Sequence, residues 1–285
     1  MKKPVGFWTA LLGAAAVLLA ALVFSLQALL RDSLDYTLPF VRYGGTFRYP
    51  EMRIGNFRLS YYWIMMLLGT AGMSILLSFR KKEHGIGTLR AVLTGILLAV
   101  FGFIGAKLLY ILENFRSVLK NGLDFSGVSF FGTVFFMPAA IPLIALILRI
   151  PRKGFTDFCT PAGLLMLAFI RIGCFTRGCC EGITVHYGMR PWIVPVQLLE
   201  CSFDLVLLAV LLLPSVKKRF RGVLYCLFMG GYGLIRFAME FLRDTGKHVF
   251  GFSNGQLFSA AAILISALIL FLHFRKKASV SSEGV

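Results

Sequence analysis

Residues 255–274 read GQLFSAAAILISALILFLHF, an apolar stretch without one charged side chain. Three basic residues, Arg275, Lys276 and Lys277, follow at once. A helix of about 20 apolar residues is long enough to cross the hydrocarbon core of a bilayer, and a basic cluster at its end is typical of a cytoplasmic flank. This stretch therefore predicts a transmembrane helix, and the same pattern recurs along the chain.

Seven more apolar stretches predict an all-α protein, a polytopic transmembrane helical bundle of about eight spans. The composition agrees, because 58% of the 285 residues are hydrophobic and the mean hydropathy is +0.79, well above soluble domains. The stretch nearest the N-terminus, residues 7–30, could be a cleaved secretion signal. However, it is longer than the apolar part of a usual signal, and no small-residue cleavage site ends it. We predict that it is retained. The seven stretches are residues 7–30, 60–79, 90–112, 128–148, 157–176, 194–214 and 222–241.

Basic residues are concentrated in short clusters between alternate spans. Cytoplasmic loops carry such an excess of lysine and arginine, so eight spans place both termini in the cytoplasm and the polar site residues toward the outer leaflet. The net charge of +17 then indicates contact with anionic lipid headgroups, and we predict no nucleic-acid partner. The clusters are Lys2 and Lys3; Arg80, Lys81, Lys82 and Arg90; Arg149, Arg152 and Lys153; Lys217, Lys218, Arg219 and Arg221; and Arg275, Lys276 and Lys277.

Few ionisable residues fall inside the predicted spans. A charge placed in hydrocarbon costs at least about 2.5–3.5 kcal/mol, so each of these residues is a candidate functional residue. The candidates that we single out are Lys107, Arg171, Glu200, Arg236 and Glu240.

The seventh predicted span carries the most informative pattern. Tyr232, Arg236, Glu240 and Arg243 are spaced so that they form one stripe on a helix, and the small residues within 229–233 would let a neighbouring helix or lipid approach closely. Arg236 and Glu240 either neutralise each other within the bundle, or the guanidinium binds a lipid phosphate while the carboxylate orients it. Arginine suits the second role because its planar fork contacts phosphate bidentately.

Residues 171–182 read RIGCFTRGCCEG. Arg171 and Cys174 share a helix face, and the glycines after them predict that the helix breaks up at the outer interface. Non-helical backbone at that depth is tolerated only where protein buries it or where it lines a cavity. A cavity beside an arginine would suit a phospholipid headgroup.

Cys174, Cys179 and Cys180 leave four interpretations open. Together with His186 they could bind a metal, but the spacing matches no standard zinc pattern, and we predict no metal site. Two of them could form a disulfide on an oxidising outer face. One could be a reactive thiolate, since a nearby arginine lowers a thiol pKa. They could also simply pack as small side chains, as we expect for the other three cysteines.

Gln197 and Glu200 lie three residues apart at the start of the sixth predicted span, and Gln256 opens the eighth. All three lie toward the outer side. Glu200 either belongs to the site or is a carboxylate that the dipole favours at a helix N-terminus.

Several short motifs follow one another from about residue 50 to the C-terminus. In this order and at these spacings they resemble the bacterial prolipoprotein diacylglyceryl transferases. They are Ile54-Gly55 with Tyr61-Tyr62-Trp63, Gly105-Ala106-Lys107, Ser129-Phe130-Phe131-Gly132, Arg171-Ile172-Gly173-Cys174, Pro195-Val196-Gln197-Leu198-Leu199-Glu200, residues 232–243, and Gly255-Gln256-Leu257.

The resemblance implies an enzyme of the bacterial cytoplasmic membrane with a seven-span core. Its substrates would be phosphatidylglycerol, or another anionic phospholipid, and the lipobox cysteine in the signal peptide of a prolipoprotein. The implied chemistry is thiolate attack on an sp3 carbon with an anionic phosphate leaving. Such chemistry needs cations and a proton acceptor, and it needs no metal or cofactor.

The resemblance also implies roles for single residues. Arg171 and Arg236 would hold the phosphate, Glu240 would orient Arg236, and Tyr62 would line the site, which makes these four the catalytic candidates. The substrate-binding candidates are Gln197, Glu200, Tyr232, Arg243, Cys174, Gly173 and Gln256, and the candidate thiol site is Cys174, Cys179 and Cys180.

The chain departs from the family pattern at three places and so resembles a divergent member of the family. Phe131-Gly132-Thr133 replaces the usual His-Gly-Gly, which removes the histidine expected to activate the thiol, and Cys174 replaces an asparagine. Gly178-Cys179-Cys180 stands where the transferases have an acidic stretch. A phospholipid-using transferase with another acceptor, a thiol-redox membrane enzyme, and a non-enzymatic lipid-binding or transport protein are the alternative functions. We predict an N-terminal anchor and outer loop at 1–48, a transferase-like membrane domain at 49–277 and a cytoplasmic tail at 278–285.

Overall fold

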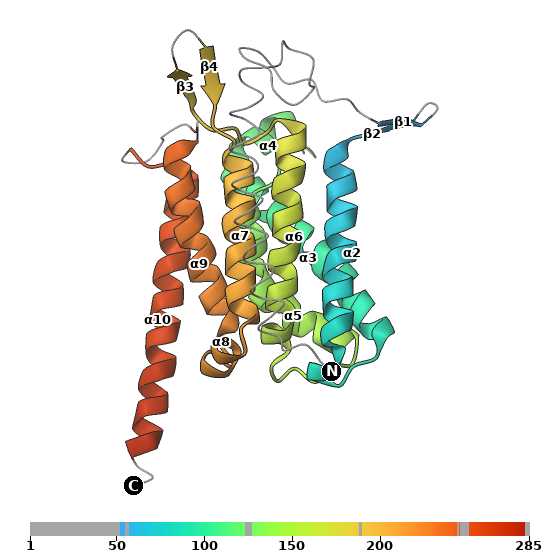
Figure 1. Ribbon diagram of the computed structural model, residues 1–285, viewed down its shortest axis with the longest axis vertical. Coiled ribbons are helices and arrows are strands. Elements are labelled where there is room, and N and C mark those ends of the chain that lie inside the picture. The colour runs from blue at the N-terminus through green and yellow to red at the C-terminus, as the bar shows by residue number, and fades with distance from the viewer. Residues whose placement is uncertain are drawn as a thin grey trace. The chain divides into compact units, whose positions relative to one another are not determined.

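Helices make up most of the part of the chain that the computed structural model describes, namely residues 52–54, 57–122, 127–187, 190–243, 245 and 251–282 (Figure 1). Two short antiparallel hairpins accompany them. The helices are α2 Tyr61–His84, α3 Thr88–Glu113, α4 Phe115–Asn121, α5 Phe130–Ile147, α6 Phe155–Arg177, α7 Val196–Leu212, α8 Pro214–Arg219, α9 Leu224–Met239, the 3-10 helix η1 Glu240–Leu242, and α10 Asn254–Ser282.

The hairpins join consecutive strands. In the first, β1 (Met52–Ile54) pairs with β2 (Phe57–Leu59). In the second, β3 (Thr184–Tyr187) pairs with β4 (Arg190–Ile193), and this hairpin connects α6 to α7.

The helices confirm the predicted all-α membrane fold, and the chain is a multi-pass membrane protein. Each predicted span from residue 60 onward corresponds to one helix, of which α7 and α9, with 17 and 16 residues, are the shortest. The predicted span 7–30 lies outside the described residues. Among the described helices, those long and apolar enough to cross a membrane by themselves are α2, α3, α5, α6 and α10.

The chain divides into two compact units. Unit 1 contains the described residues up to Gly69 and from Leu164 onward, and unit 2 contains those within Thr70–Gly163. The chain passes from one unit to the other within α2 and within α6. All of the catalytic, substrate-binding and thiol candidates from the sequence belong to unit 1.

Small residues bring α9 against two neighbours within unit 1 (Figure 1). A Cβ atom added at Gly233 would lie 3.1 Å from the carbonyl oxygen of Ser259 in α10, and one added at Gly231 would lie 2.9 Å from a methyl group of Leu207 in α7. Larger residues at these positions would push the helices apart. The prediction that residues 229–233 allow a neighbouring helix to approach is therefore confirmed.

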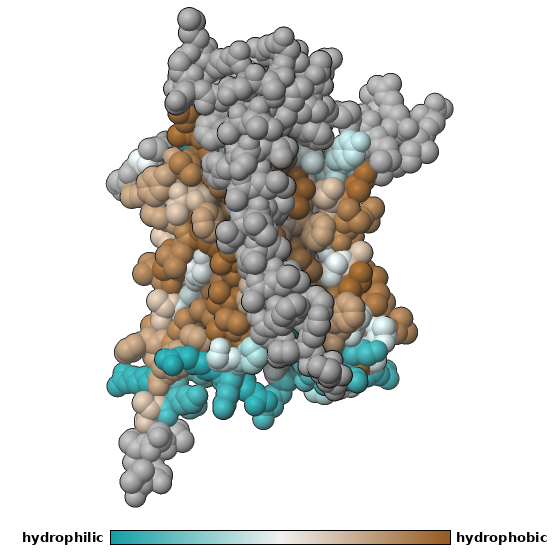
Figure 2. Space-filling model, viewed as in Figure 1, coloured by the Kyte–Doolittle hydropathy of each residue, from teal (hydrophilic) through white to brown (hydrophobic). Residues whose placement is uncertain are grey.

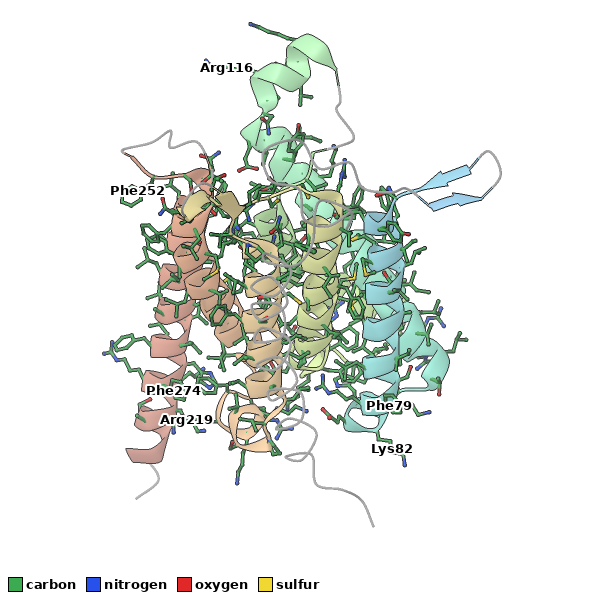
Figure 3. The ribbon with its side chains drawn as sticks, turned by 45° about the horizontal axis from the view of Figure 1, so that its top comes forward. Phe79, Lys82, Arg116, Arg219, Phe252 and Phe274 are labelled. Carbon is green, nitrogen blue, oxygen red and sulfur yellow. The ribbon has the colours of Figure 1, made fainter. Side chains whose placement is uncertain are left out.

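Polar and apolar side chains are separated along the helices of unit 1. At one end, the guanidinium of Arg219 lies 5.7 Å from the ring centre of Phe274 (Figure 3), and Figure 2 shows a hydrophilic surface there, over α8. Above it the surface is hydrophobic (Figure 2), and large side chains of α10 such as Leu264 and Leu268 are exposed. Exposed apolar side chains next to a basic end are typical of a helix in contact with lipid.

Close contact between α3 and α5 holds unit 2 together. A Cβ atom added at Gly105 would lie 2.8 Å from the carbonyl oxygen of Gly132. Lys107, in the same part of α3, donates a hydrogen bond to the carbonyl oxygen of Gly127 at 3.0 Å, and its ammonium lies 4.8 Å from the ring centre of Tyr110. The charge of Lys107 is therefore accommodated by neighbours within its own unit.

Candidate active site

Glu200, in the second turn of α7, is the centre of a buried set of ion pairs. Its Oε2 lies 2.7 Å from Nε of Arg171 on α6, and its Oε1 lies 2.5 Å from Nη1 of Arg236 on α9. Nη1 of Arg243 lies 3.5 Å from the same Oε1. One carboxylate therefore bridges arginines that three separate segments supply.

Glu240 is the second anionic centre. Its Oε2 lies 2.8 Å from Nη2 of Arg236 and 3.9 Å from Nε of Arg243, so the predicted contact between Glu240 and Arg236 is present. Its Oε1 accepts hydrogen bonds from the hydroxyls of Ser253 at 2.8 Å and Thr245 at 3.0 Å. We refer to Arg171, Glu200, Arg236, Glu240 and Arg243 as the ion-pair network.

The ion-pair network has the chemistry of an anion-binding centre. Three guanidinium groups face two carboxylates, so the five groups together carry one net positive charge, and none of their side chains is more than 12% exposed. Burying an unbalanced charge is costly unless a counter-charge compensates it. Nε and Nη1 of Arg243 make no hydrogen bond to the described residues, so donors remain for a bound anion.

The predicted stripe on the seventh span is helical only in part. Helix α9 ends at Met239, the chain tightens into the 3-10 turn η1, and the backbone of Arg243 is extended. Placing Arg243 on the same helix was therefore wrong. Arg243 still reaches Glu200, because it forms an antiparallel β-bridge with Gly182 that fixes its position.

Tyr232 joins the network from the helical part of this stripe. Its hydroxyl accepts a hydrogen bond from Nη2 of Arg171 at 2.9 Å, and its side chain is 1% exposed. The contact holds a second nitrogen of Arg171 in place, in addition to the one that faces Glu200.

Gln256 takes part in the N-terminal cap of α10. Its side-chain oxygen accepts a hydrogen bond from the N–H of Ser253 at 3.1 Å, and its own N–H donates to the hydroxyl of Ser253 at 3.2 Å. This reciprocal pair is a capping box. A Cβ atom added at Gly255 would lie 2.8 Å from the carboxylate of Glu240, so the first turn of α10 closes directly over Glu240, and Gln256 reaches Glu240 through Ser253.

The first turn of α7 links the ion-pair network to the loop after α6. The side-chain amide of Gln197 donates a hydrogen bond to the carbonyl oxygen of Cys179 at 2.7 Å, and Gln197 is 3% exposed. Glu200 follows three residues later, so one face of α7 contacts both the loop and the arginines.

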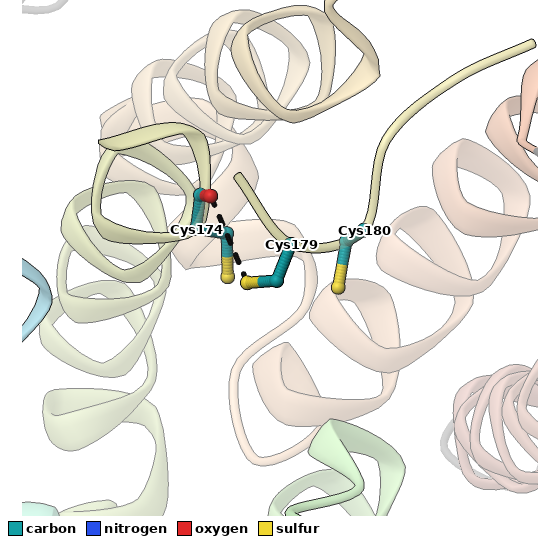
Figure 4. Close-up of side chains that lie close together, drawn as sticks. All are labelled: Cys174, Cys179 and Cys180. Carbon is teal, nitrogen blue, oxygen red and sulfur yellow. Dashed lines mark hydrogen bonds between the residues drawn. The ribbon is translucent and has the colours of Figure 1, made fainter. Parts of the chain in front are cut away.

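Cys174, Cys179 and Cys180, which we call the thiol cluster, lie at the end of α6 (Figure 4). Their Sγ atoms all lie within 4.8 Å of one another, and all three are free thiols. Cys174 is buried and Cys180 is exposed, so the cluster opens to the surface. The pKa of Cys180 is lowered, because the neighbouring thiols of Cys174 and Cys179 stabilise its thiolate and because Arg243 and Arg171 place positive charge nearby.

The way α6 ends explains why two of these sulfurs meet. Gly178 has a φ of 68°, its N–H donates to the carbonyl oxygen of Phe175 at 3.2 Å, and the N–H of Cys179 donates to the carbonyl oxygen of Cys174 at 3.1 Å. This pattern is a Schellman motif, which brings the side chains at the positions of Cys174 and Cys179 together. Cys180 also has a positive φ of 64°. The prediction that the glycine-rich segment ends the helix is confirmed.

Tyr62 packs against the same end of α6. The guanidinium of Arg177 lies 5.6 Å from its ring centre, and a Cβ atom added at Gly173 would lie 3.2 Å from its Cδ2. Gly173 therefore leaves the room that the ring of Tyr62 occupies. These contacts place Tyr62 beside the helix turn that carries Cys174.

Asp204 is missing from the sequence-based candidates. It lies one turn beyond Glu200 on α7, is completely buried, and neither carboxylate oxygen has a hydrogen-bond partner among the described residues. The four-residue spacing that drew attention to Arg236 and Glu240 also applies to Glu200 and Asp204, so the signal was available. Ser253 and Thr245 were missed as well, since uncharged residues in an outer segment give no such signal.

Comparisons with known proteins identify the family of the chain. The family model for prolipoprotein diacylglyceryl transferase matches residues 51–272. A Clostridium tetani protein named phosphatidylglycerol–prolipoprotein diacylglyceryl transferase is 30% identical over 76% of this chain and 94% of its own. Proteins with the same name from Dehalococcoides mccartyi and Nitrosospira multiformis are 26% and 29% identical, over 79% and 82% of this chain and 92% and 89% of theirs. The chain belongs to the prolipoprotein diacylglyceryl transferase family.

Proposed function

We propose that this protein transfers a diacylglyceryl group from phosphatidylglycerol to the lipobox cysteine of prolipoproteins. The observation that carries the proposal is the ion-pair network, a buried centre with one net positive charge inside the region that the family model matches. An anionic phospholipid would supply the missing negative charge, and arginine is suited to recognise its phosphate because its donors match the phosphate oxygens in pairs.

The reaction requires one bond to form and one to break. The acceptor thiol loses its proton to solvent, and its sulfur forms a thioether bond to the sp3 glyceryl carbon of the lipid. The bond from that carbon to the phosphate oxygen breaks, and glycerol phosphate leaves. Arg171 and Arg236 stabilise the charge that develops on the departing phosphate. Glu200 and Glu240 act as positioning residues, because each holds one or more guanidinium groups in a fixed geometry before the lipid arrives.

The proposed site faces the outer leaflet of the cytoplasmic membrane, and the proposed orientation puts both termini in the cytoplasm. Within unit 1, Glu200 stands near the start of α7, whereas the basic residues of α8 follow its other end. Since basic clusters favour the cytoplasmic side, this separation supports a site that prolipoproteins reach from the outer side.

The test uses the full chain purified into vesicles of phosphatidylglycerol and a synthetic lipobox peptide. Mass spectrometry should detect the peptide thioether together with glycerol phosphate. Vesicles of phosphatidylcholine alone and a peptide with serine in place of the lipobox cysteine are the controls. Folded protein that yields no thioether with phosphatidylglycerol would contradict the proposal.

A further inference from the structure

The thiol cluster is arranged as a set of metal ligands that linear spacing did not reveal. In a tetrahedral zinc site, Zn–S bonds of about 2.3 Å place sulfurs about 3.8 Å apart. The three Sγ atoms already lie within 4.8 Å of one another, so each pair needs to close by at most about 1 Å. The side chains project to the same side of the segment (Figure 4), and side-chain rotation can supply that change.

We infer that Cys174, Cys179 and Cys180 bind one Zn²⁺ ion, whose fourth coordination position takes the acceptor thiol. Three protein ligands with one open position are typical of catalytic zinc, whereas structural zinc is closed by four. The exposure of Cys180 leaves that position accessible from the surface. The identity of the fourth ligand rests on the proposed function.

The surrounding residues suit such a centre. Zn²⁺ with three thiolates carries one net negative charge, and a fourth thiolate makes it two, so the cationic Arg243 and Arg171 that act on Cys180 would stabilise it. The segment is also held before metal arrives, by the Schellman hydrogen bonds at Gly178 and by the bond from Gln197 to the carbonyl of Cys179. A preformed ligand set lowers the cost of ordering on binding.

A bound zinc ion would supply what the chain lacks at its Phe131-Gly132-Thr133 motif, namely a means of activating the acceptor thiol. A thiol that coordinates zinc loses its proton to solvent, and the resulting thiolate attacks the glyceryl carbon while glycerol phosphate leaves. The cluster cysteines themselves are unsuited to carry the lipid, because a thioether formed on one of them is a poor leaving group for a second displacement.

The first test measures metal without reference to activity. Full-length protein purified in detergent, dialysed against micromolar Zn²⁺, should hold about one zinc per chain by mass spectrometry of the metal. Cys174→Ser, Cys179→Ser and Cys180→Ser should each weaken zinc binding at least about tenfold, whereas Cys226→Ser, outside the cluster, should retain it. Equal zinc binding in all four variants, an absence of bound zinc, or a disulfide within the cluster would overturn the inference.

The second test addresses thiol coordination. Protein loaded with Co²⁺ in place of Zn²⁺ should change its thiolate-to-metal absorption when the lipobox peptide is added, and should not change with the serine peptide. An unchanged spectrum overturns the assignment of the fourth ligand. Removing zinc should slow thioether formation, and equal rates with and without zinc overturn the activating role.

The two proposals fail in different ways. Zinc bound by the cluster, with no thioether formed by the loaded protein, contradicts the proposed function and leaves the metal site standing. Thioether formed by protein that takes up no zinc when it is dialysed against Zn²⁺ contradicts the metal site and leaves the function standing.

Discussion

Oε2 of Glu200 lies 2.7 Å from Nε of Arg171, within a side-chain environment that is almost entirely closed to solvent. Its other oxygen faces Arg236. Because one carboxylate serves both arginines, its loss would leave two buried cations without their shared partner. The resemblance implies only a supporting role for Glu200. In the structure, however, the geometry of the arginines depends most on this residue.

Glu200→Gln should lower the free energy of unfolding by about 3–5 kcal/mol, as expected when one partner of a buried ion pair is removed. Glu113→Gln, at a partly exposed position in α3, is the matched control and should change it by less than about 0.5 kcal/mol. Unfolding in mixed detergent, followed by circular dichroism, provides the measurement. Equal stability of the two variants would show that Glu200 does not hold the arginines.

Arg236→Lys should reduce thioether formation at least about tenfold, although it keeps the charge. Arg236 uses Nη1 toward Glu200 and Nη2 toward Glu240, and a single ammonium cannot occupy both positions of that fork. A lost charged hydrogen bond of about 1.5–3 kcal/mol corresponds to that factor. Arg221→Lys, an exposed position, should leave the rate unchanged. Full activity of Arg236→Lys would remove this arginine from the phosphate role.

Asp204→Asn should leave the free energy of unfolding within about 1 kcal/mol of the parent or raise it. The side chain is completely buried and its oxygens accept no hydrogen bond from the described residues, so the substitution removes a desolvated acid at nearly constant shape. The same unfolding assay checks this, side by side with Glu200→Gln. A loss as large as that of Glu200→Gln would mean that Asp204 is an essential member of the charge balance.

Gly255→Ala should lower activity at least about tenfold, since the added methyl group would displace the Glu240 carboxylate that holds Arg236. Gly163→Ala in α6 is the matched control, because nothing lies within 4 Å of the added Cβ atom. In a helix interior that change should stabilise the protein by about 0.5–1 kcal/mol. Thioether formation and unfolding should be measured for both variants. Normal activity of Gly255→Ala would contradict the tight fit over Glu240.

The spans and much of the site could be predicted from the sequence, because both depend on local patterns. Apolar length and basic flanks located each described span, and charges within apolar runs identified Arg171, Glu200, Arg236 and Glu240. The prediction of one helical stripe was wrong at Arg243, because no residue pattern indicates the 3-10 turn η1 or the β-bridge to Gly182. Its position is set by pairing with a distant segment.

Long-range partners set the remaining features of the site. The meeting of Glu240 with Ser253 requires a loop to return α10 to the end of α9, and spacing along one helix carries no such information. The linear spacing of the three cysteines does not predict that their sulfur atoms meet. The sulfurs are close because of a helix-ending motif and the positive φ of Cys180. The sequence therefore indicates which residues belong to the site better than it indicates which of them contact one another.

The capping of Glu240 by the first turn of α10 has a consequence for biosynthesis. A nascent chain that has already threaded α6, α7 and α9 into the bilayer possesses the three arginines and Glu200, yet it lacks Ser253 and Gly255, which close over Glu240. The ribosome must translate beyond residue 255 before the proposed phosphate site can form. The enzyme would thus be inactive during most of its own insertion into the membrane. It would bind lipid at this site only after translation has passed that point.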